Sequence, residues 1–157
     1  MTPIAPTRST RLPTVAASVA LALAALLAGC GSPGGPTPIA DRPIDLDGRC
    51  EQTDEAGFRE QARLRVVDNR VEALDWQLWV GQRGTCRFVF DDFRQVKFRP
   101  SIELVARDGG GCKLLVWQER RFVTLAHAGC EARCTPGIYD DAWPVMFAHG
   151  GGGCANP

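Results

Sequence analysis

The chain has 157 residues, of which 45% are hydrophobic and 23% are charged, and its formal net charge is zero. This length suits one domain, and the composition excludes a wholly disordered chain. Basic residues do not outnumber acidic ones, so the charge does not indicate a nucleic-acid partner. The chain contains seven cysteines, and an odd number of cysteines in a secreted protein requires an explanation.

The first thirty residues carry a targeting pattern. Arg8 and Arg11 precede an almost entirely apolar run over residues 15–27, which is shorter than the about 20 residues that span a bilayer. A basic start followed by a short apolar core is typical of a secretory signal peptide. A buried core helix is the alternative, but the run has no polar face.

The apolar run ends in Leu27-Ala28-Gly29-Cys30, which resembles the lipobox of bacterial lipoproteins. This resemblance implies removal of residues 1–29 as a signal peptide and acylation of Cys30, with palmitate among the chains. Gly31, where that family uses Asp to mark inner-membrane proteins, implies delivery to the outer membrane. We therefore expect an envelope protein that faces the periplasm and contacts the membrane through its lipid.

The remaining chain divides into a tether and one folded domain. Residues 30–47 are expected to form the lipidated tether, because their Pro and Gly residues support neither helix nor sheet. Residues 48–157 are then the folded domain. An even number of cysteines in an oxidising compartment predicts disulfides. The expected disulfide cysteines are Cys50, Cys86, Cys112, Cys130, Cys134 and Cys154.

Short segments of alternating apolar and polar residues follow one another through this domain. Two of them, residues 62–66 and 71–80, flank the turn residues Asp68 and Asn69. The alternation changes phase near Ala73, which indicates a β-bulge. Further strands are expected over residues 86–90, 96–99, 102–107, 113–118 and 122–127.

The last part of the domain is expected to contain a short helical turn over residues 128–133, and residues 139–147 are a candidate for one additional strand. Strands at such regular spacing predict a mainly β fold. We expect a small antiparallel β-sandwich or barrel of six to seven strands with one helical turn, cross-linked by disulfides.

One disulfide follows from a predicted hairpin. The strands 113–118 and 122–127 leave Cys112 and Cys130 at the two open ends of their hairpin. Opposed strand residues are close enough for a disulfide, so we predict a Cys112–Cys130 bond. The remaining local pairs would be Cys134–Cys154 and Cys50–Cys86. A Cys50–Cys154 bond, which would join the two ends of the domain, is the alternative.

Catalytic patterns are weak. Beyond residue 30 the only serines are Ser32 and Ser101, and neither lies in a Gly-x-Ser-x-Gly motif. Disulfide formation leaves no reactive thiolate. The acidic pairs Asp91-Asp92 and Asp140-Asp141 fit solvated turns better than acid–base catalysis, because adjacent residues of a strand point to opposite faces. We therefore expect no enzymatic activity and no cofactor.

A metal site is the most specific alternative function that the sequence suggests. His127, Cys130 and Cys134 would share one face of a helix, and His149 and Cys154 could complete a set of four ligands. His127, however, belongs to the strand pattern, and the cysteines are more simply explained by disulfides. The sequence therefore predicts no metal ligand.

Tryptophans supply the candidate binding residues. Trp76 shares the apolar face of its strand, whereas Trp79 lies on the opposite face, and Trp117 is close in sequence to Arg120 and Arg121. An exposed Trp beside arginines is typical of a protein-binding hot spot. We take Trp79, Trp117, Arg120 and Arg121 as a candidate binding patch. The alternative is that both faces of these strands are buried.

In outline, a small disulfide-bonded β domain on a lipid anchor is similar to the membrane-bound lysozyme inhibitors of Gram-negative bacteria. The likeness covers size, location and fold class only. The Ser-rich loop of those inhibitors has no counterpart here, so no site residue is carried over. We expect a non-enzymatic envelope lipoprotein that acts as a binding or structural module, with another envelope protein as partner. Inhibition of a lysozyme-like or other hydrolase is the alternative, and metal binding is a lower one.

Overall fold

A computed structural model describes residues 41–155 of the chain. The expected signal peptide, the lipobox cysteine Cys30 and most of the tether lie outside the described residues. The strands are β1 (Leu46–Thr53), β2 (Phe58–Val67), β3 (Arg70–Val80), β4 (Thr85–Val89), β5 (Phe93–Lys97), β6 (Ile102–Ala106), β7 (Lys113–Gln118), β8 (Phe122–Ala128) and β9 (Val145–Ala148). Three short 3-10 turns accompany them, namely η1 (Phe90–Asp92), η2 (Glu131–Arg133) and η3 (Tyr139–Asp141). No helix over residues 41–155 is long and apolar enough to cross a bilayer.

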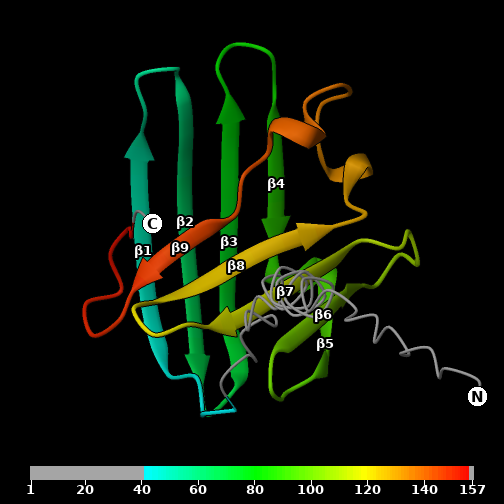
Figure 1. Cartoon of the computed structure of the whole chain (residues 1–157). Coiled ribbons are helices and arrows are strands. Elements are labelled where there is room, and N and C mark those ends of the chain that lie inside the picture. Colours follow the sequence, from blue (N-terminus) through cyan, green and yellow to red (C-terminus); the bar gives the residue numbers. More distant parts are fainter. Residues whose placement is uncertain (1–40, 156–157) are drawn as a thin grey trace, which may run out of the picture. The chain divides into compact units, whose positions relative to one another are not determined.

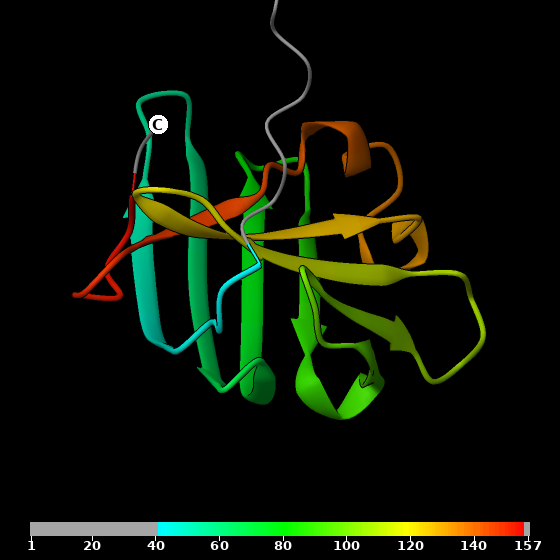
Figure 2. The ribbon, with the colours of Figure 1, turned by 60° about the horizontal axis from the view of Figure 1, so that its bottom comes forward.

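Consecutive strands form two antiparallel sheets (Figure 1). The first sheet has the order β1-β2-β3-β4, and the second has the order β5-β6-β7-β8-β9. The second sheet runs obliquely across one face of the first (Figures 1 and 2), and their facing side chains form one core. Over residues 41–155 no strand ladder joins the two sheets, so the arrangement resembles a sandwich and not a closed barrel.

The alternation of the sequence decides which face of each strand is buried. In β2, Leu64 and Val66 are buried, whereas Arg63 and Arg65 between them are exposed. The largest side chains that lose all contact with water are Trp76, Phe88, Phe93 and Phe147. Each fully buried side chain of this kind contributes about 1.5–3 kcal/mol to folding.

The expected β-bulge is confirmed. Arg65 pairs with Ala73 and Val66 pairs with Val71, so that Glu72 is the extra residue on β3. The turn before it contains Asp68 with φ 43° and Asn69 with φ 61°. Both values lie in the left-handed region that Asp and Asn tolerate better than most side chains.

The number of strands is nine, and not six to seven as the alternation predicted. The missed strand at the start is β1, whose alternation is hidden by Gly48 at a buried position. A Cβ on Gly48 would lie 2.7 Å from Cδ1 of Phe147, so packing between the sheets leaves no room for a larger side chain there. Ile44 is also buried at 1% exposure, so the packed core includes part of residues 30–47, for which a tether was expected.

The strand expected over residues 96–99 lies earlier in the chain, as β5. Phe93 is fully buried and begins this strand, whereas Val96 and Phe98 are each about 40% exposed. The 3-10 turn η1 directly follows β4 and leads the chain from the first sheet into β5 of the second, which begins at the buried Phe93. The helical turn expected within residues 128–133 is confirmed in shortened form as η2, and the expected final strand is β9.

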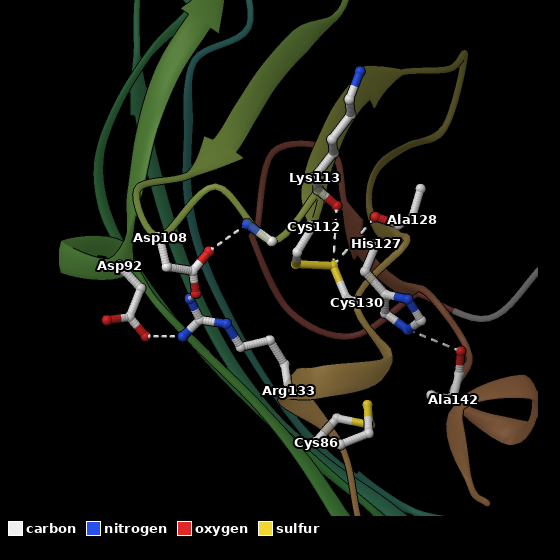
Figure 3. The surroundings of a disulfide bond; sticks show 12 residues. Cys86, Asp92, Asp108, Cys112, Lys113, His127, Ala128, Cys130, Arg133 and Ala142 are labelled. Carbon is white, nitrogen blue, oxygen red and sulfur yellow. Dashed lines mark hydrogen bonds and ion pairs between the residues drawn. A yellow bond between two sulfur atoms is a disulfide. The ribbon is translucent and has the colours of Figure 1, made fainter. Parts of the chain in front are cut away.

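Three disulfides cross-link the domain. The predicted Cys112–Cys130 bond is confirmed, with the two Cα atoms 4.4 Å apart (Figure 3). The predicted local pairs Cys134–Cys154 and Cys50–Cys86 are wrong, because the other bonds are Cys86–Cys134 and Cys50–Cys154. Cys134 forms an isolated β-bridge with Cys86, and the segment after β9 brings Cys154 to β1. Tertiary packing, and not distance along the chain, therefore selects the partners.

Candidate functional site

The structure does not bring the residues of the alternative metal site together as a set of ligands. Cys130 and Cys134 are each in a disulfide, and Nε2 of His127 donates a hydrogen bond to the Ala142 carbonyl oxygen at 3.1 Å (Figure 3). Over residues 41–155 no group of three or more His, Cys, Asp or Glu side chains could hold a metal ion. The residues that the helical spacing put on one face therefore have separate structural roles.

His127 belongs to an aromatic cluster in the core. The centroid of its ring lies 5.5 Å from that of Trp76, 5.3 Å from that of Phe88 and 5.0 Å from that of Tyr139. Burial lowers the pKa of His127, although the hydrogen bond to Ala142 acts in the opposite direction. His127 is half-buried, and these ring contacts pack β8 against β3 and β4 of the first sheet.

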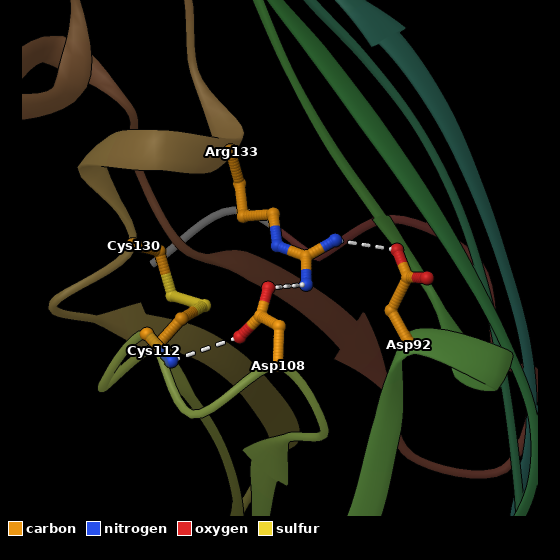
Figure 4. A network of polar contacts seen from close by, with 6 residues as sticks. Asp92, Asp108, Cys112, Cys130 and Arg133 are labelled. Carbon is orange, nitrogen blue, oxygen red and sulfur yellow. Dashed lines mark hydrogen bonds and ion pairs between the residues drawn. A yellow bond between two sulfur atoms is a disulfide. The ribbon is translucent and has the colours of Figure 1, made fainter.

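A polar network joins the loops beside the Cys112–Cys130 disulfide (Figure 4). The Arg133 guanidinium contacts Oδ2 of Asp92 at 2.6 Å and Oδ2 of Asp108 at 2.7 Å. Asp108 also accepts a hydrogen bond from the Gly110 amide at 2.9 Å. The carboxylates are used to position η1 and the β6–β7 loop, so the network is a structural cross-link.

The four residues of the candidate binding patch do not form one surface. Trp79 lies on β3 of the first sheet, where the guanidinium carbon of Arg59 is 3.9 Å from the ring centroid. Trp117 lies on β7 of the second sheet and lines a different cavity. Arg120 and Arg121 are exposed in the β7–β8 turn. Alternation predicts which face of a strand a residue occupies, but it does not reveal which strands share a sheet, so it could not separate Trp79 from Trp117.

The cavity that Trp117 lines is a cleft of about 810 Å³. It lies where the end of the β1–β2 hairpin meets β7, β8 and β9. Its size falls within the range of about 300–1,000 Å³ that is typical of small-molecule sites. The larger apolar side chains of its lining are Phe58, Trp117, Phe122, Trp143 and Met146, and the acidic ones are Asp54, Glu55, Glu60 and Glu119.

The register of the second sheet places three of the lining residues side by side. Trp117 pairs directly with Thr124, and Thr124 pairs with Met146 on the edge strand β9. Nε1 of Trp117 donates a hydrogen bond to the Glu119 carboxylate at 3.0 Å, which restrains the indole ring. Trp143 precedes β9 and is 66% exposed. The cleft therefore combines a restrained tryptophan with an exposed one.

Glu60 is the buried acid of the cleft. It is only 1% exposed, and its Oε1 accepts a hydrogen bond from Nε2 of Gln52, its cross-strand partner, at 2.5 Å. Within residues 41–155 its Oε2 makes no hydrogen bond of normal geometry, and neither does Nε1 of the buried Trp76, the indole donor that acts on this carboxyl. Burial raises the pKa of Glu60, while Gln52 and the Trp76 indole act in the opposite direction.

Sequence reasoning did not identify Glu60 or Trp143 as site residues. A signal for Glu60 is nevertheless present, because it occupies the same alternation phase as the buried residues Ala62, Leu64 and Val66 of β2. A charged residue in an apolar phase is rarely fully buried unless it is paired. No comparable local signal distinguishes Trp143, whose position depends on the path of the chain between η3 and β9.

Glu60→Gln is expected to change how stability depends on pH. A raised pKa means that the folded chain binds the Glu60 proton more tightly than the unfolded chain, so ionisation at higher pH costs stability. Gln cannot ionise. We expect the free energy of unfolding of the wild type, relative to that of the variant, to be highest at about pH 4 and to fall towards pH 8. Urea denaturation at several pH values measures this difference, and parallel pH profiles for the two proteins would contradict it.

Comparisons with known proteins identify no relative. No family model matches the chain, and neither a curated protein nor a solved structure matches it. The residues of the cleft and the pattern of the first thirty residues are therefore the features of this chain that indicate a function.

Proposed function

We propose that this chain is a lipid-anchored envelope protein whose β domain is a non-enzymatic binding module. Two observations support this location. The sequence up to Cys30 resembles a lipoprotein signal, and the three disulfides are typical of proteins that fold outside the reducing cytoplasm. In this proposal the domain faces the periplasm from the outer membrane, and the cleft between the β1–β2 hairpin and β9 is its binding site.

The observation that carries the binding function is the aromatic lining of the cleft. Trp143 is 66% exposed beside it, which is unusual for the largest apolar side chain and common at binding sites. The hydrogen bond from Trp117 to Glu119 holds a second indole in place before any ligand arrives. A restrained lining reduces the entropy lost on binding and so favours affinity.

NMR spectroscopy of the four indole N–H groups tests the cleft. Titration with a chemically diverse set of drug-sized compounds is expected to shift the signals of Trp117 and Trp143 for the compounds that bind. Trp143→Ala should lower the affinity for these compounds by about tenfold, because one wall of the cleft is lost. Trp79→Ala is the matched control, since Trp79 lines a separate cavity, and should leave them unchanged. Binding that is indifferent to Trp143→Ala would overturn the assignment of the site.

The anchor is tested separately. Expressed in a Gram-negative host, the chain is expected to enter the membrane fraction and to incorporate radiolabelled palmitate. Cys30→Ala should abolish both, because the thiol is the acceptor of the acyl chain, whereas Ser32→Ala in the same segment should change neither. Labelling that persists in Cys30→Ala would exclude Cys30 as the lipidated residue.

A further inference from the structure

We infer that the cleft takes an organic cation, namely a protonated amine or guanidinium carried on an apolar body, with Glu60 as its counter-charge. This inference rests on the proposed binding function of the cleft and specifies the ligand. Its basis is the charge of the lining, the incompletely hydrogen-bonded carboxyl of the buried Glu60 and the aromatic walls.

The lining of the cleft is acidic. Four carboxylates line it, and no Lys, Arg or His side chain is present among its lining residues within the described part of the chain. Arg59 is close in sequence but contacts the Trp79 ring outside the cleft. A cleft with low-dielectric walls and charges of one sign concentrates ligands of the opposite sign.

Two of the acids already have structural partners. Oδ1 of Asp54 accepts a hydrogen bond from the Phe58 amide at 2.8 Å, which closes the β1–β2 turn. Oε1 of Glu119 accepts the indole hydrogen bond of Trp117 at 3.0 Å. Glu55 is exposed at the rim of the cleft, so its interactions are weakened by water. Glu60 is therefore the acid whose charge a ligand would compensate most strongly.

The environment of Glu60 favours a cationic donor. Its Oε2 is buried and makes no hydrogen bond of normal geometry, and the donor that acts on the carboxyl from the core, the Trp76 indole N–H, is likewise left without a well-formed bond. Such atoms are expensive to leave unpaired in a native structure. A protonated amine or guanidinium would satisfy this oxygen with a charge-assisted hydrogen bond. A neutral ligand would leave the carboxylate uncompensated. The acids are spread along the lining and form no cluster that could hold a metal ion, so an organic cation fits this cleft better than a metal cation does.

The aromatic walls suit the remainder of such a ligand. Trp117 and Trp143 offer indole rings, which attract cations through their faces more strongly than other aromatic side chains. Phe58, Phe122 and Met146 supply apolar surface for an uncharged body. The volume of about 810 Å³ accommodates a small organic molecule, so we commit to that class of occupant.

A matched series of probes tests the inference. The full chain, oxidised and reconstituted in phosphatidylcholine nanodiscs, is titrated calorimetrically with 4-phenylbutylamine, with 4-phenylbutan-1-ol and with 4-phenylbutanoate, and empty nanodiscs provide the blank. The three probes share one apolar body and differ in charge. We expect the amine to bind about tenfold more tightly than the alcohol, and the carboxylate to bind more weakly than both.

Two variants assign the effect to Glu60. Glu60→Gln should weaken amine binding by about tenfold and leave alcohol binding almost unchanged, because only the charge is removed. Glu51→Gln is the matched control, since it removes the same charge from β1, where Glu51 is exposed and lies outside the cleft lining. Glu51→Gln should affect neither probe.

Three results would overturn the cation inference: equal affinity for amine and alcohol, equal effects of the two Glu→Gln variants, or no amine binding at millimolar concentration. These results are distinguishable from failure of the binding function itself. Alcohol binding that depends on Trp143 would retain the cleft as a site for neutral ligands, and the indole NMR screen decides whether the cleft binds any compound.

Discussion

Replacing Cys50 and Cys154 together by alanine is expected to lower the free energy of unfolding by about 4–5 kcal/mol. This disulfide joins residues 104 positions apart, and it connects β1 to the segment after β9. A cross-link over so long a loop removes more conformational freedom from the unfolded chain than a short-range one does. Chemical denaturation of the oxidised variant measures the loss, which is large compared with the total stability of a domain of this size.

The matched comparison is the double alanine variant of Cys112 and Cys130. That disulfide spans only 18 positions within the β7–β8 hairpin, so we expect a smaller loss of about 3 kcal/mol. Three of these four cysteines are buried and Cys154 is half-buried, so the difference between the variants reports mainly loop length. Equal losses in the two variants would show that local packing, and not loop length, determines what these disulfides contribute.

Gly152→Ala is expected to destabilise the domain by about 3 kcal/mol or more, because it combines backbone strain with a steric overlap. Gly152 has φ 64°, and a Cβ there would overlap the carbonyl oxygen of Asp47 at the start of β1. The Gly152 carbonyl accepts a hydrogen bond from the Arg49 amide at 2.7 Å, so moving the segment away would break this contact. Thermal denaturation measures the loss of stability.

Gly150→Ala is the control for this prediction. Gly150 has φ 79°, but a Cβ at this position would meet no atom within 4 Å. It should therefore cost only the left-handed strain of about 1 kcal/mol. The excess loss in Gly152→Ala measures the close approach of the C-terminal segment to β1. If the two variants had the same melting temperature, the close contact with Asp47 would contribute nothing to the destabilisation.

Much of the domain follows from local pattern. Residues close in sequence determine the alternation over β2 and β3, the bulge at Glu72 and the left-handed turn at Asp68 and Asn69. The Cys112–Cys130 bond was predictable for the same reason, because a tight hairpin sets the register of its two ends. Strand β1 escaped prediction because its buried Gly48 is dictated by Phe147, almost a hundred residues away.

The candidate site, in contrast, depends mainly on contacts between residues that are distant in sequence. Glu60 and Gln52 are brought together by a β1–β2 pairing that the sequence analysis did not include, and Trp143 reaches the cleft from a segment of irregular backbone. Trp79 and Trp117 looked equivalent by alternation, yet they belong to different sheets. The burial of Glu60 was the one feature of the cleft with a readable signal, since its phase matches that of Leu64.

By itself, the sequence determined the features that depend on neighbours along the chain: the mainly β character, most strands, the hairpin disulfide and the lipobox-like pattern before Cys30. Only the tertiary structure decided the pairings Cys50–Cys154 and Cys86–Cys134, the assignment of strands to two sheets, and the cleft around Glu60. The physical reason is that alternation records whether a residue faces the core, and it carries no information about which distant residue it meets there.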